Sequence, residues 1–432
     1  MTLTSTQSPL AILGGTPTVP DTAVKHWPPI DDTDRKMVLD SLNGGKHAFG
    51  PNSQAFQEEM AAWNGNKYGI FTNSGTAALH MGLVGCGVGA GDHVLVTGYS
   101  WSSSATCIIH HNAIPIFVDI DFDTINMDID KIEAAITSKT KAIVAVHLHG
   151  LALNMDKLMA IANKYNLKVI EDACQSHGAL YKGRKVGTMG HCAALSFNQN
   201  KSLCAGESGM FLTDDEEICA GAASLWSFGE TRTPLESRDY HAYALGWMYR
   251  GNDLTAAFGR SQLRKLDGYL EAERSNAAVL RAELQDITGL ILPTEPEGHS
   301  HTYYNFSIRI DMQAIGWTGD PVRMRDAIVK AVQAEGSWCC VWQRFILPSM
   351  TVFQAKNAYG KGSPWAEHDA LDIDYNPANF PVAQRHSDTH FAVIMPLRAP
   401  NGPDVAKLTG QGIRKVFENI SKIDPDQILD SK

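Results

Sequence analysis

Residues 167–213 read LKVIEDACQSHGAL, YKGRKVGTMGHCAALSFNQNKSL and CAGESGMFLT, and the rest of the chain is organised around them. The first apolar run predicts a buried strand that ends in two carboxylates, Glu171 and Asp172. A second apolar run, 193–197, leads to Lys201 and then to a glycine-punctuated return strand. Open α/β sheets bind ligands outside the carboxyl ends of their strands. We therefore expect Asp172 and Lys201 to face one crevice.

A carboxylate and a lysine at strand ends have the chemistry of a pyridoxal phosphate site. The amine of Lys201 can bond to the aldehyde carbon of the cofactor, and the carboxylate of Asp172 can keep the pyridine nitrogen protonated, so that the ring accepts electrons. The alternative is a structural ion pair between these residues, or a solvated surface lysine.

A phosphate cradle is predicted upstream. The strand-like run YGIFTN leads into Ser74, Gly75 and Thr76, and then into the helical pattern AALHMGLVGCG. The free N–H groups of a first helical turn and the helix dipole favour an anion. The alternative for this turn is an ordinary Ser/Thr N-cap.

Strand and helix patterns alternate through the first half of the chain. HVLVTGYS ends at Trp101, and IPIFVDID and KAIVAVHLHG are further strands separated by helical patterns. This alternation predicts an α/β fold with a mostly parallel sheet that has helices on both faces. His147 and His149 follow one of these strands, but no third ligand stands at a metal-binding spacing, so we expect no metal site.

Composition narrows the class of protein. A chain of 432 residues with 44% hydrophobic and 19% charged residues suits a large α/β domain with a smaller one. The net charge of −10 argues against nucleic acid or an anionic membrane as a partner. Eight cysteines without a framework spacing predict free thiols, and neither a signal peptide nor a membrane span is recognisable, so we expect a cytoplasmic protein.

Three motifs together, E-D-A-C-Q-S-H-G-A, S-F-x-x-x-K and G-E-S-G, resemble those of the DegT/DnrJ/EryC1/StrS family of sugar and cyclitol aminotransferases. The resemblance extends from about residue 10 to about residue 396. It implies the fold type I of pyridoxal-phosphate-dependent transferases: a large domain with a mostly parallel mixed sheet flanked by helices, and a smaller α+β domain. The expected division is an N-terminal arm, 1–30, a large cofactor domain, 31–265, and a C-terminal domain, 266–432.

The resemblance also implies a role for each matching residue. Lys201 forms the Schiff base, Asp172 holds the pyridine nitrogen, Gln175 contacts the ring hydroxyl, Ser196 contacts the phosphate, and Trp101 stacks on the pyridine ring.

Two positions depart from the pattern of the family. Met248 stands two residues before Arg250, where an asparagine is usual, so we consider Asn252 as a substitute for the phosphate contact across subunits. Ser208 in G-E-S-G replaces a glycine. The segment 246–262 resembles the part that reaches the neighbouring subunit, which implies a homodimer with shared active sites.

The implied activity is transfer of an amino group from glutamate or glutamine to a keto group on a sugar nucleotide or a keto-cyclitol, in natural-product or cell-surface sugar biosynthesis. Another pyridoxal phosphate reaction, such as replacement, decarboxylation or carbon–carbon bond formation, stays open, and so does a non-catalytic regulatory protein that binds the cofactor. A dehydrating branch of the family carries histidine in place of the lysine, and Lys201 speaks against it. Residues 338–385 form an irregular, aromatic-rich tract, and for its part 351–380, which is polar and contains Gly and Pro, we expect a substrate-facing loop or an insertion.

Overall fold

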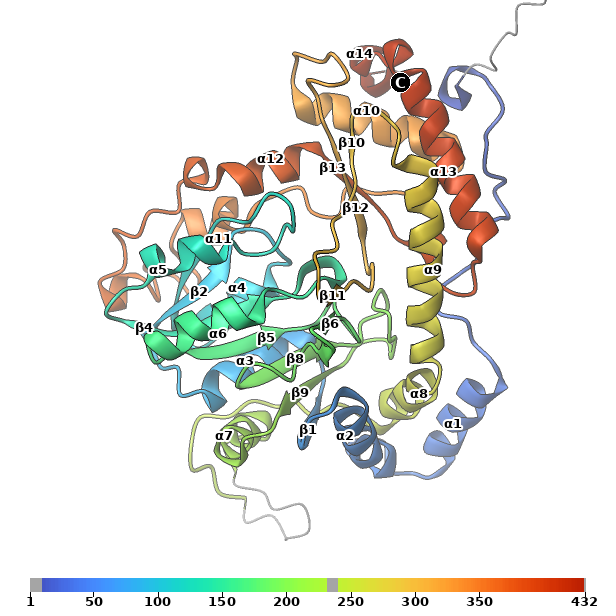
Figure 1. Cartoon of the computed structure of the whole chain (residues 1–432). Coiled ribbons are helices and arrows are strands. Elements are labelled where there is room, and N and C mark those ends of the chain that lie inside the picture. The colour runs from blue at the N-terminus through green and yellow to red at the C-terminus, as the bar shows by residue number, and fades with distance from the viewer. Residues whose placement is uncertain (1–9, 231–239, 431–432) are drawn as a thin grey trace, which may run out of the picture.

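A seven-stranded sheet lies at the centre of the computed structural model, which describes residues 10–230 and 240–430 (Figure 1). The strand order is β1-β9-β8-β5-β4-β2-β3, and only β9 runs against the others. The strands are β1 (Tyr68–Thr72), β2 (His93–Thr97), β3 (Ile114–Val118), β4 (Thr140–Val146), β5 (Lys168–Asp172), β8 (Cys192–Ser196) and β9 (Gly209–Thr213). The predicted mostly parallel mixed sheet is therefore present.

The alternation of side chains along these strands builds two separate cores. In β2, Val94 and Val96 belong to one core and Leu95 to the other. In β5, Ile170 belongs to the first core and Val169 to the second, because successive side chains of a strand point to opposite faces. Each strand of the sheet therefore contributes apolar side chains to both cores, as is typical of a parallel sheet that is covered on both faces.

Helices cover both faces of the sheet. The first core packs against α3 (Gly75–Gly85), α4 (Ser103–His110) and α7 (Glu216–Trp226). The second packs against α2 (Pro51–Asn64), α6 (Met155–Lys164) and α8 (Asp253–Leu263), and against the start of α9 (Leu266–Leu284). Two further helices, α1 (Asp32–Asn43) and the short α5 (Ile132–Ala135), lie near α8 and β3. The chain turns between α8 and α9, so residues 253–284 form two helices and not a single long one.

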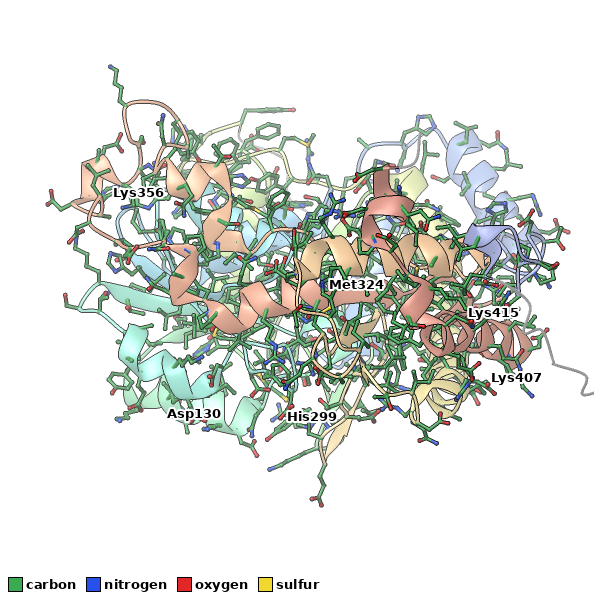
Figure 2. All side chains as sticks on the ribbon, turned by 90° about the horizontal axis from the view of Figure 1, so that it is seen from above. Asp130, His299, Met324, Lys356, Lys407 and Lys415 are labelled. Atoms are coloured by element: carbon green, nitrogen blue, oxygen red, sulfur yellow. The ribbon has the colours of Figure 1, made fainter. Side chains whose placement is uncertain are left out.

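The C-terminal part has a core of its own around a three-stranded antiparallel sheet. Its order is β10 (Leu290–Ile291), β12 (Phe306–Ile310) and β13 (His390–Val393). This sheet packs with α9 and with α10 (Pro321–Ala334), α13 (Pro403–Glu418) and α14 (Pro425–Asp430). From above, Lys407 and Lys415 of α13 lie at one end of the molecule and Lys356 at the other (Figure 2). The division at residue 265 remains our proposal.

The described part of the N-terminal arm packs on this C-terminal core. Leu10 is fully buried there, and Val19 donates its N–H to the carbonyl of Glu335. The carboxylate of Glu335 also accepts N–H bonds from Ala11 and Thr18, at 2.8 and 3.1 Å. Residues 10–19 are thus held by residues of the same chain.

Within the tract 338–385, the segment 351–380, predicted as a substrate-facing loop or an insertion, buries most of its aromatic residues on the large sheet. Phe353, Trp365 and Tyr375 belong to the first core, and the hydroxyl of Tyr375 donates to the carbonyl of Pro115 at 2.7 Å. The tract carries α11 (Thr351–Gln354) and leads into α12 (Pro381–Thr389). Only its beginning, around residues 338–342, reaches the cavity described below.

A third, small sheet joins the two parts of the chain: β7 (Arg184–Lys185) pairs with β6 (Leu180–Tyr181), and β6 pairs with β11 (His299–Ser300). None of the described helices has both the length and the apolarity needed to cross a membrane.

Candidate active site

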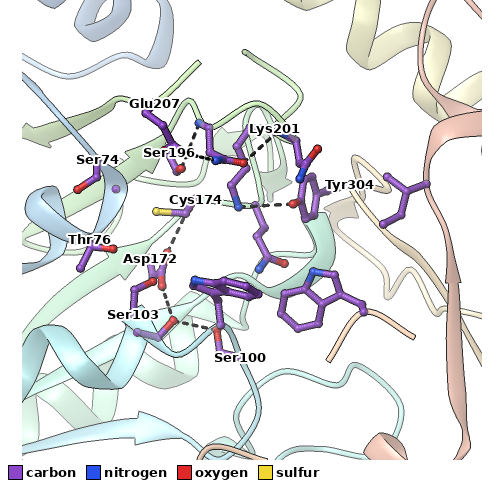
Figure 3. Close-up of a pocket in the computed structure, with 18 of the residues that line it drawn as sticks. Ser74, Thr76, Ser100, Ser103, Asp172, Cys174, Ser196, Lys201, Glu207 and Tyr304 are labelled. Atoms are coloured by element: carbon purple, nitrogen blue, oxygen red, sulfur yellow. Dashed lines mark hydrogen bonds between the residues drawn. The ribbon is translucent and has the colours of Figure 1, made fainter. Parts of the chain in front are cut away.

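A cavity of about 670 Å³ opens at the carboxyl ends of β5 and β8 (Figure 3). Seven of the eight predicted site residues line it, and Asn252 does not. Such a volume suits a small molecule the size of a cofactor with its substrate. The lining consists of Ser74, Gly75, Thr76, Ser100, Trp101, Ser103, Ser104, Asp172, Cys174, Gln175, Ser196, Asn198, Asn200, Lys201, Glu207, Tyr304, Trp338, Cys340, Trp342, Ile394 and Met395.

Asp172 is the last residue of β5, and its side chain lines this cavity. Its Oδ2 accepts the hydroxyl proton of Ser104 at 2.7 Å, and its Oδ1 accepts the N–H of Cys174 at 3.2 Å. Ser104 is in turn 2.8 Å from the hydroxyl of Ser100. The carboxylate is buried and held in one orientation, as an acid that must face a ring nitrogen requires.

The neighbouring acid, Glu171, points to the opposite face of the sheet and has a structural role. Its two oxygens accept N–H bonds from Gly187 at 2.6 Å, Met189 at 2.7 Å and Gly190 at 2.5 Å, and from His147 Nε2 at 2.9 Å. Burial alone would raise the pKa of Glu171, but the bonds from His147 and the backbone outweigh it and lower the pKa. Glu171 thus fastens the loop 187–190 to the sheet.

We expect Glu171→Gln to destabilise the fold without changing the cavity. An amide places an NH2 group against backbone N–H donors, and lost bonds to a buried charge cost about 2–4 kcal/mol of the free energy of unfolding. Urea unfolding measures this loss, with the exposed Glu216→Gln as the control that should stay within about 0.5 kcal/mol. Equal urea midpoints for both variants would contradict the role given to Glu171.

The start of α3, which we call the cradle, has the free backbone N–H groups that an anion site requires. Ser74 caps the helix by accepting the N–H of Ala77 at 3.1 Å, while the N–H groups of Gly75 and Thr76 meet no acceptor within the described residues. A Cβ on Gly75 would stand 2.8 Å from the Cβ of Ser196 and 2.8 Å from the sulfur of Cys174. The backbone therefore approaches β8 as closely as only glycine allows, and it directs two N–H donors at the cavity.

Gln175 is oriented by a residue of the neighbouring strand. Its side-chain oxygen accepts the backbone N–H of His149 at 3.2 Å. The amide NH2 of Gln175 is then left to donate into the cavity, which suits an oxygen such as a ring hydroxylate. His149 itself is buried and does not line the cavity.

Lys201 lies beside Tyr304 and on a loop that Arg398 holds. Its Nζ is 3.5 Å from the hydroxyl of Tyr304 and 4.9 Å from the centre of that ring (Figure 3). The guanidinium of Arg398 stacks on the same ring at 5.2 Å and donates to the carbonyl of Asn200 at 2.6 Å. The amine is therefore positioned from the C-terminal part of the chain as well as from the sheet.

Burial keeps two further groups near the cavity neutral. Burial, together with the charges of Lys201 and Arg398, lowers the pKa of His177 to about 3. Burial, and then the charge of Asp172, raises the pKa of the Cys174 thiol well above its usual value. Cys174 and His177 therefore add no charge next to Asp172 and Lys201.

Several residues that shape the site carry no recognisable signal in the sequence. Ser104 stands among four serines of YSWSSSAT, and nothing local singles it out as the partner of Asp172. Tyr304, Trp338 and Trp342 come from segments far along the chain, and only tertiary packing brings them to the cavity.

The two positions that depart from the pattern of the family, Met248 and Ser208, and the substitute Asn252 do not line the cavity. Asn252 caps α8 by accepting the N–H of Thr255 at 3.0 Å. The side chain of Met248 is 50% exposed, and its carbonyl accepts from Asn73 at 3.3 Å. Ser208 is buried beside β8, where a small side chain is accommodated. The contact of Asn252 across subunits, and the homodimer itself, stay predictions.

The residues around the cavity fit pyridoxal phosphate. The cradle of Gly75 and Thr76 suits the phosphate, Asp172 the ring nitrogen, and Lys201 the aldehyde. Trp101, whose surface is 56% exposed, offers an indole face beside them.

Comparisons with known proteins agree with this geometry. The model of the DegT/DnrJ/EryC1/StrS aminotransferase family matches residues 28–361. The chain is 34% identical to the L-glutamine:2-deoxy-scyllo-inosose aminotransferase of Streptomyces paromomycinus, over 70% of this chain and 74% of that protein. It is also 34% identical to the GDP-perosamine synthase of Caulobacter vibrioides, over 72% of this chain and 81% of that one.

A solved structure confirms the fold class. The crystal structure of 3-amino-5-hydroxybenzoic acid synthase superposes with a TM-score of 0.82 at 25% identity, and the match covers 94% of this chain and 100% of that one. The family match spans the cradle of α3, the acid of β5 and the lysine after β8. The chain is therefore an aminotransferase of the DegT/DnrJ/EryC1/StrS family.

Proposed function

We propose that the cavity binds pyridoxal 5'-phosphate and that Lys201 holds it covalently. The observation that carries this proposal is the convergence of Lys201, Asp172 and the α3 cradle on one cavity. When bound, the cofactor supplies an electron sink that stabilises negative charge on the carbon next to the transferred amine. The aminotransferases of this family depend on this cofactor.

Each protein residue around the cofactor has its own role. Asp172, fixed by Ser104 and the N–H of Cys174, holds a proton on the pyridine nitrogen. The amine of Lys201, once released from its covalent bond, moves the proton between the substrate carbon and the cofactor carbon. Tyr304, 3.5 Å away, keeps that amine over the cavity.

For the substrates, we propose glutamate or glutamine as the amino donor and a keto group on a sugar nucleotide or a keto-cyclitol as the acceptor. Support comes from the two relatives, whose names give a cyclitol ketone and a nucleotide-linked sugar. The place of such a reaction is the biosynthesis of amino sugars or aminocyclitols for natural products or cell surfaces.

The donor half of the reaction tests this function directly. Mixing the purified holoenzyme with glutamate, glutamine, alanine or aspartate should convert the absorbance of the aldehyde form of the cofactor to that of the amine form with at least one of the first two. Alanine and aspartate serve as comparison donors. Retention of the cofactor with no conversion by any of the four would contradict an aminotransferase and favour the non-catalytic alternative.

A further inference from the structure

The two neighbours of Lys201 along the chain are held by residues from distant segments. The carbonyl of Asn200 accepts an N–H of Arg398 at 2.6 Å, and the hydroxyl of Ser202 donates to Oε2 of Glu273 at 3.1 Å. Lys201 lines the cavity, whereas Arg398 and Glu273 do not. The chain on both sides of the lysine is therefore fixed by two residues that lie outside the cavity.

Arg398 and Glu273 face each other as a buried charge pair. Nε of Arg398 is 3.6 Å from Oε1 of Glu273, and each side chain is only 1% exposed. Glu273 lies in α9 between Leu270, which belongs to the second core, and Ala277, which belongs to the C-terminal core. Arg398 follows β13 of the C-terminal sheet (Figure 1). The pair thus stands where the two parts of the chain meet.

The guanidinium of Arg398 also connects Lys201 to the N-terminal arm. It lies over the rings of Trp27 and Tyr304, 5.2 Å from each centre. Nζ of Lys201 lies over the same ring of Tyr304, 4.9 Å from its centre. The carbonyl of Trp27 accepts the side-chain N–H of Gln199 at 3.2 Å. A shift of Arg398 would therefore displace both the ring beside the lysine amine and the loop that carries the lysine.

The pair is poorly suited to a purely stabilising role. Within the described residues, Nε and Nη1 of Arg398 and Oε1 of Glu273 make no hydrogen bond. Burial raises the pKa of Glu273 to about 7, although the charge of Arg398 and the bond from Ser202 oppose the rise. Well-packed apolar side chains often stabilise a fold as well as a buried ion pair does. Apolar side chains could not, however, hold the polar groups of Asn200 and Ser202.

We propose that Arg398 and Glu273 are positioning residues for Lys201: as a pair they fix the loop 199–202 and the ring of Tyr304, and so hold the amine where it meets the aldehyde carbon of the cofactor. Neither residue needs to contact the cofactor. Bond formation depends steeply on the placement of the reacting atoms, and a displacement of about 1 Å can cost about 100-fold. The inference rests on the proposed covalent attachment of the cofactor to Lys201.

The affinities for two forms of the cofactor report the position of the amine without turnover. Pyridoxal phosphate can bond to Lys201, whereas pyridoxamine phosphate meets the same cradle and Asp172 but has no aldehyde. We call the ratio of their dissociation constants, pyridoxamine phosphate over pyridoxal phosphate, the aldehyde preference. Lys201→Ala gives its value without the covalent bond. Equilibrium dialysis of the full-length protein, stripped of cofactor, measures both constants at about pH 8.5, where the carboxyl of Glu273 is ionised.

The two variants of the pair should lower the aldehyde preference to different extents. Arg398→Met should lower it by at least about tenfold, because methionine holds neither Asn200 nor the ring of Tyr304. Glu273→Gln should lower it by about threefold or more, since glutamine still accepts from Ser202 but carries no charge opposite Arg398. The double variant should lose little more than Arg398→Met alone, because the residues act as a unit. If Arg398→Met does not fold, Arg398→Lys takes its place, with a loss of about threefold or more, because lysine lacks the planar fork.

Glu335→Gln is the matched control. Glu335 is also fully buried and forms an ion pair, at 2.8 Å with Lys415, but it holds the start of the N-terminal arm and not the loop of Lys201. Its replacement should lower stability and leave the aldehyde preference within about twofold. A wild-type preference in the Arg398 variant or in Glu273→Gln, losses that multiply in the double variant, or an equal loss in Glu335→Gln overturns the inference. An unchanged preference in Lys201→Ala contradicts the proposed covalent attachment instead.

Discussion

Lys201→Ala is expected to lower turnover by at least about 10⁴-fold, because the variant loses both the covalent attachment point and the base that moves the proton. In the natural protein, Nζ of Lys201 is 3.5 Å from the hydroxyl of Tyr304. The shorter alanine side chain reaches neither Tyr304 nor the cavity. The phosphate cradle and Asp172 remain, so the variant should still bind cofactor, more weakly. Steady-state kinetics with the competent donor and acceptor measure the loss, and equilibrium dialysis measures the bound cofactor.

Lys185→Ala is the matched control for this loss. Lys185 is another half-buried lysine, and its Nζ lies 3.8 Å from the ring centre of Trp63. Burial lowers the pKa of Lys185. It lies outside the cavity, so its replacement should leave the turnover per folded enzyme within a factor of about two, as for a residue without a site contact. Residual turnover of Lys201→Ala close to that of this control would show that another group carries the proton.

Asp172→Asn is the second change with a large expected effect. The amide oxygen can still accept the N–H of Cys174, and the hydroxyl of Ser104 can turn to accept from the amide NH2 group, so the side chain should keep its place. It carries no charge, however, and cannot keep the pyridine nitrogen protonated. We expect turnover to fall by about 10³-fold while most of the cofactor is retained. Activity assays with cofactor quantified after gel filtration separate these two effects.

The adjacent acid provides the comparison for Asp172. Glu171→Gln removes the neighbouring charge on the same strand, but its oxygens bind the loop 187–190 on the opposite face of the sheet. It should lower stability and leave the turnover per folded enzyme nearly unchanged. If both variants lost turnover alike, the difference in role drawn from the two faces of β5 would be wrong.

Local pattern in the sequence predicted those features whose cause is local. The period of two along β5 places Val169 and Glu171 on one face and Ile170 and Asp172 on the other, and the strand end places Asp172 at the ligand edge. The turn before α3 likewise predicted a helix start, which Ser74 caps. In each case a few consecutive residues determine the backbone and the direction of the side chains.

Features that depend on contacts between distant segments could not be predicted. Tyr304 reaches Lys201 from the loop before β12, and Trp342 reaches the cavity because Tyr99 and His149 support it. Residues 351–380 were predicted to be a substrate-facing loop or an insertion, and within them Trp365 is buried against the large sheet. Nothing in an irregular aromatic segment indicates which of two cores it will join, because hydrophobic burial has no direction.

The covalent attachment of the cofactor to Lys201 is the central claim, and borohydride trapping tests it most directly. Reduction of the holoenzyme fixes the bond between cofactor and lysine, and peptide mapping by mass spectrometry then locates the label. We predict a single pyridoxyl group on the peptide that contains Lys201, and none in Lys201→Ala treated in parallel. A label on any other lysine, or the absence of a label from a holoenzyme that is active, would contradict the account.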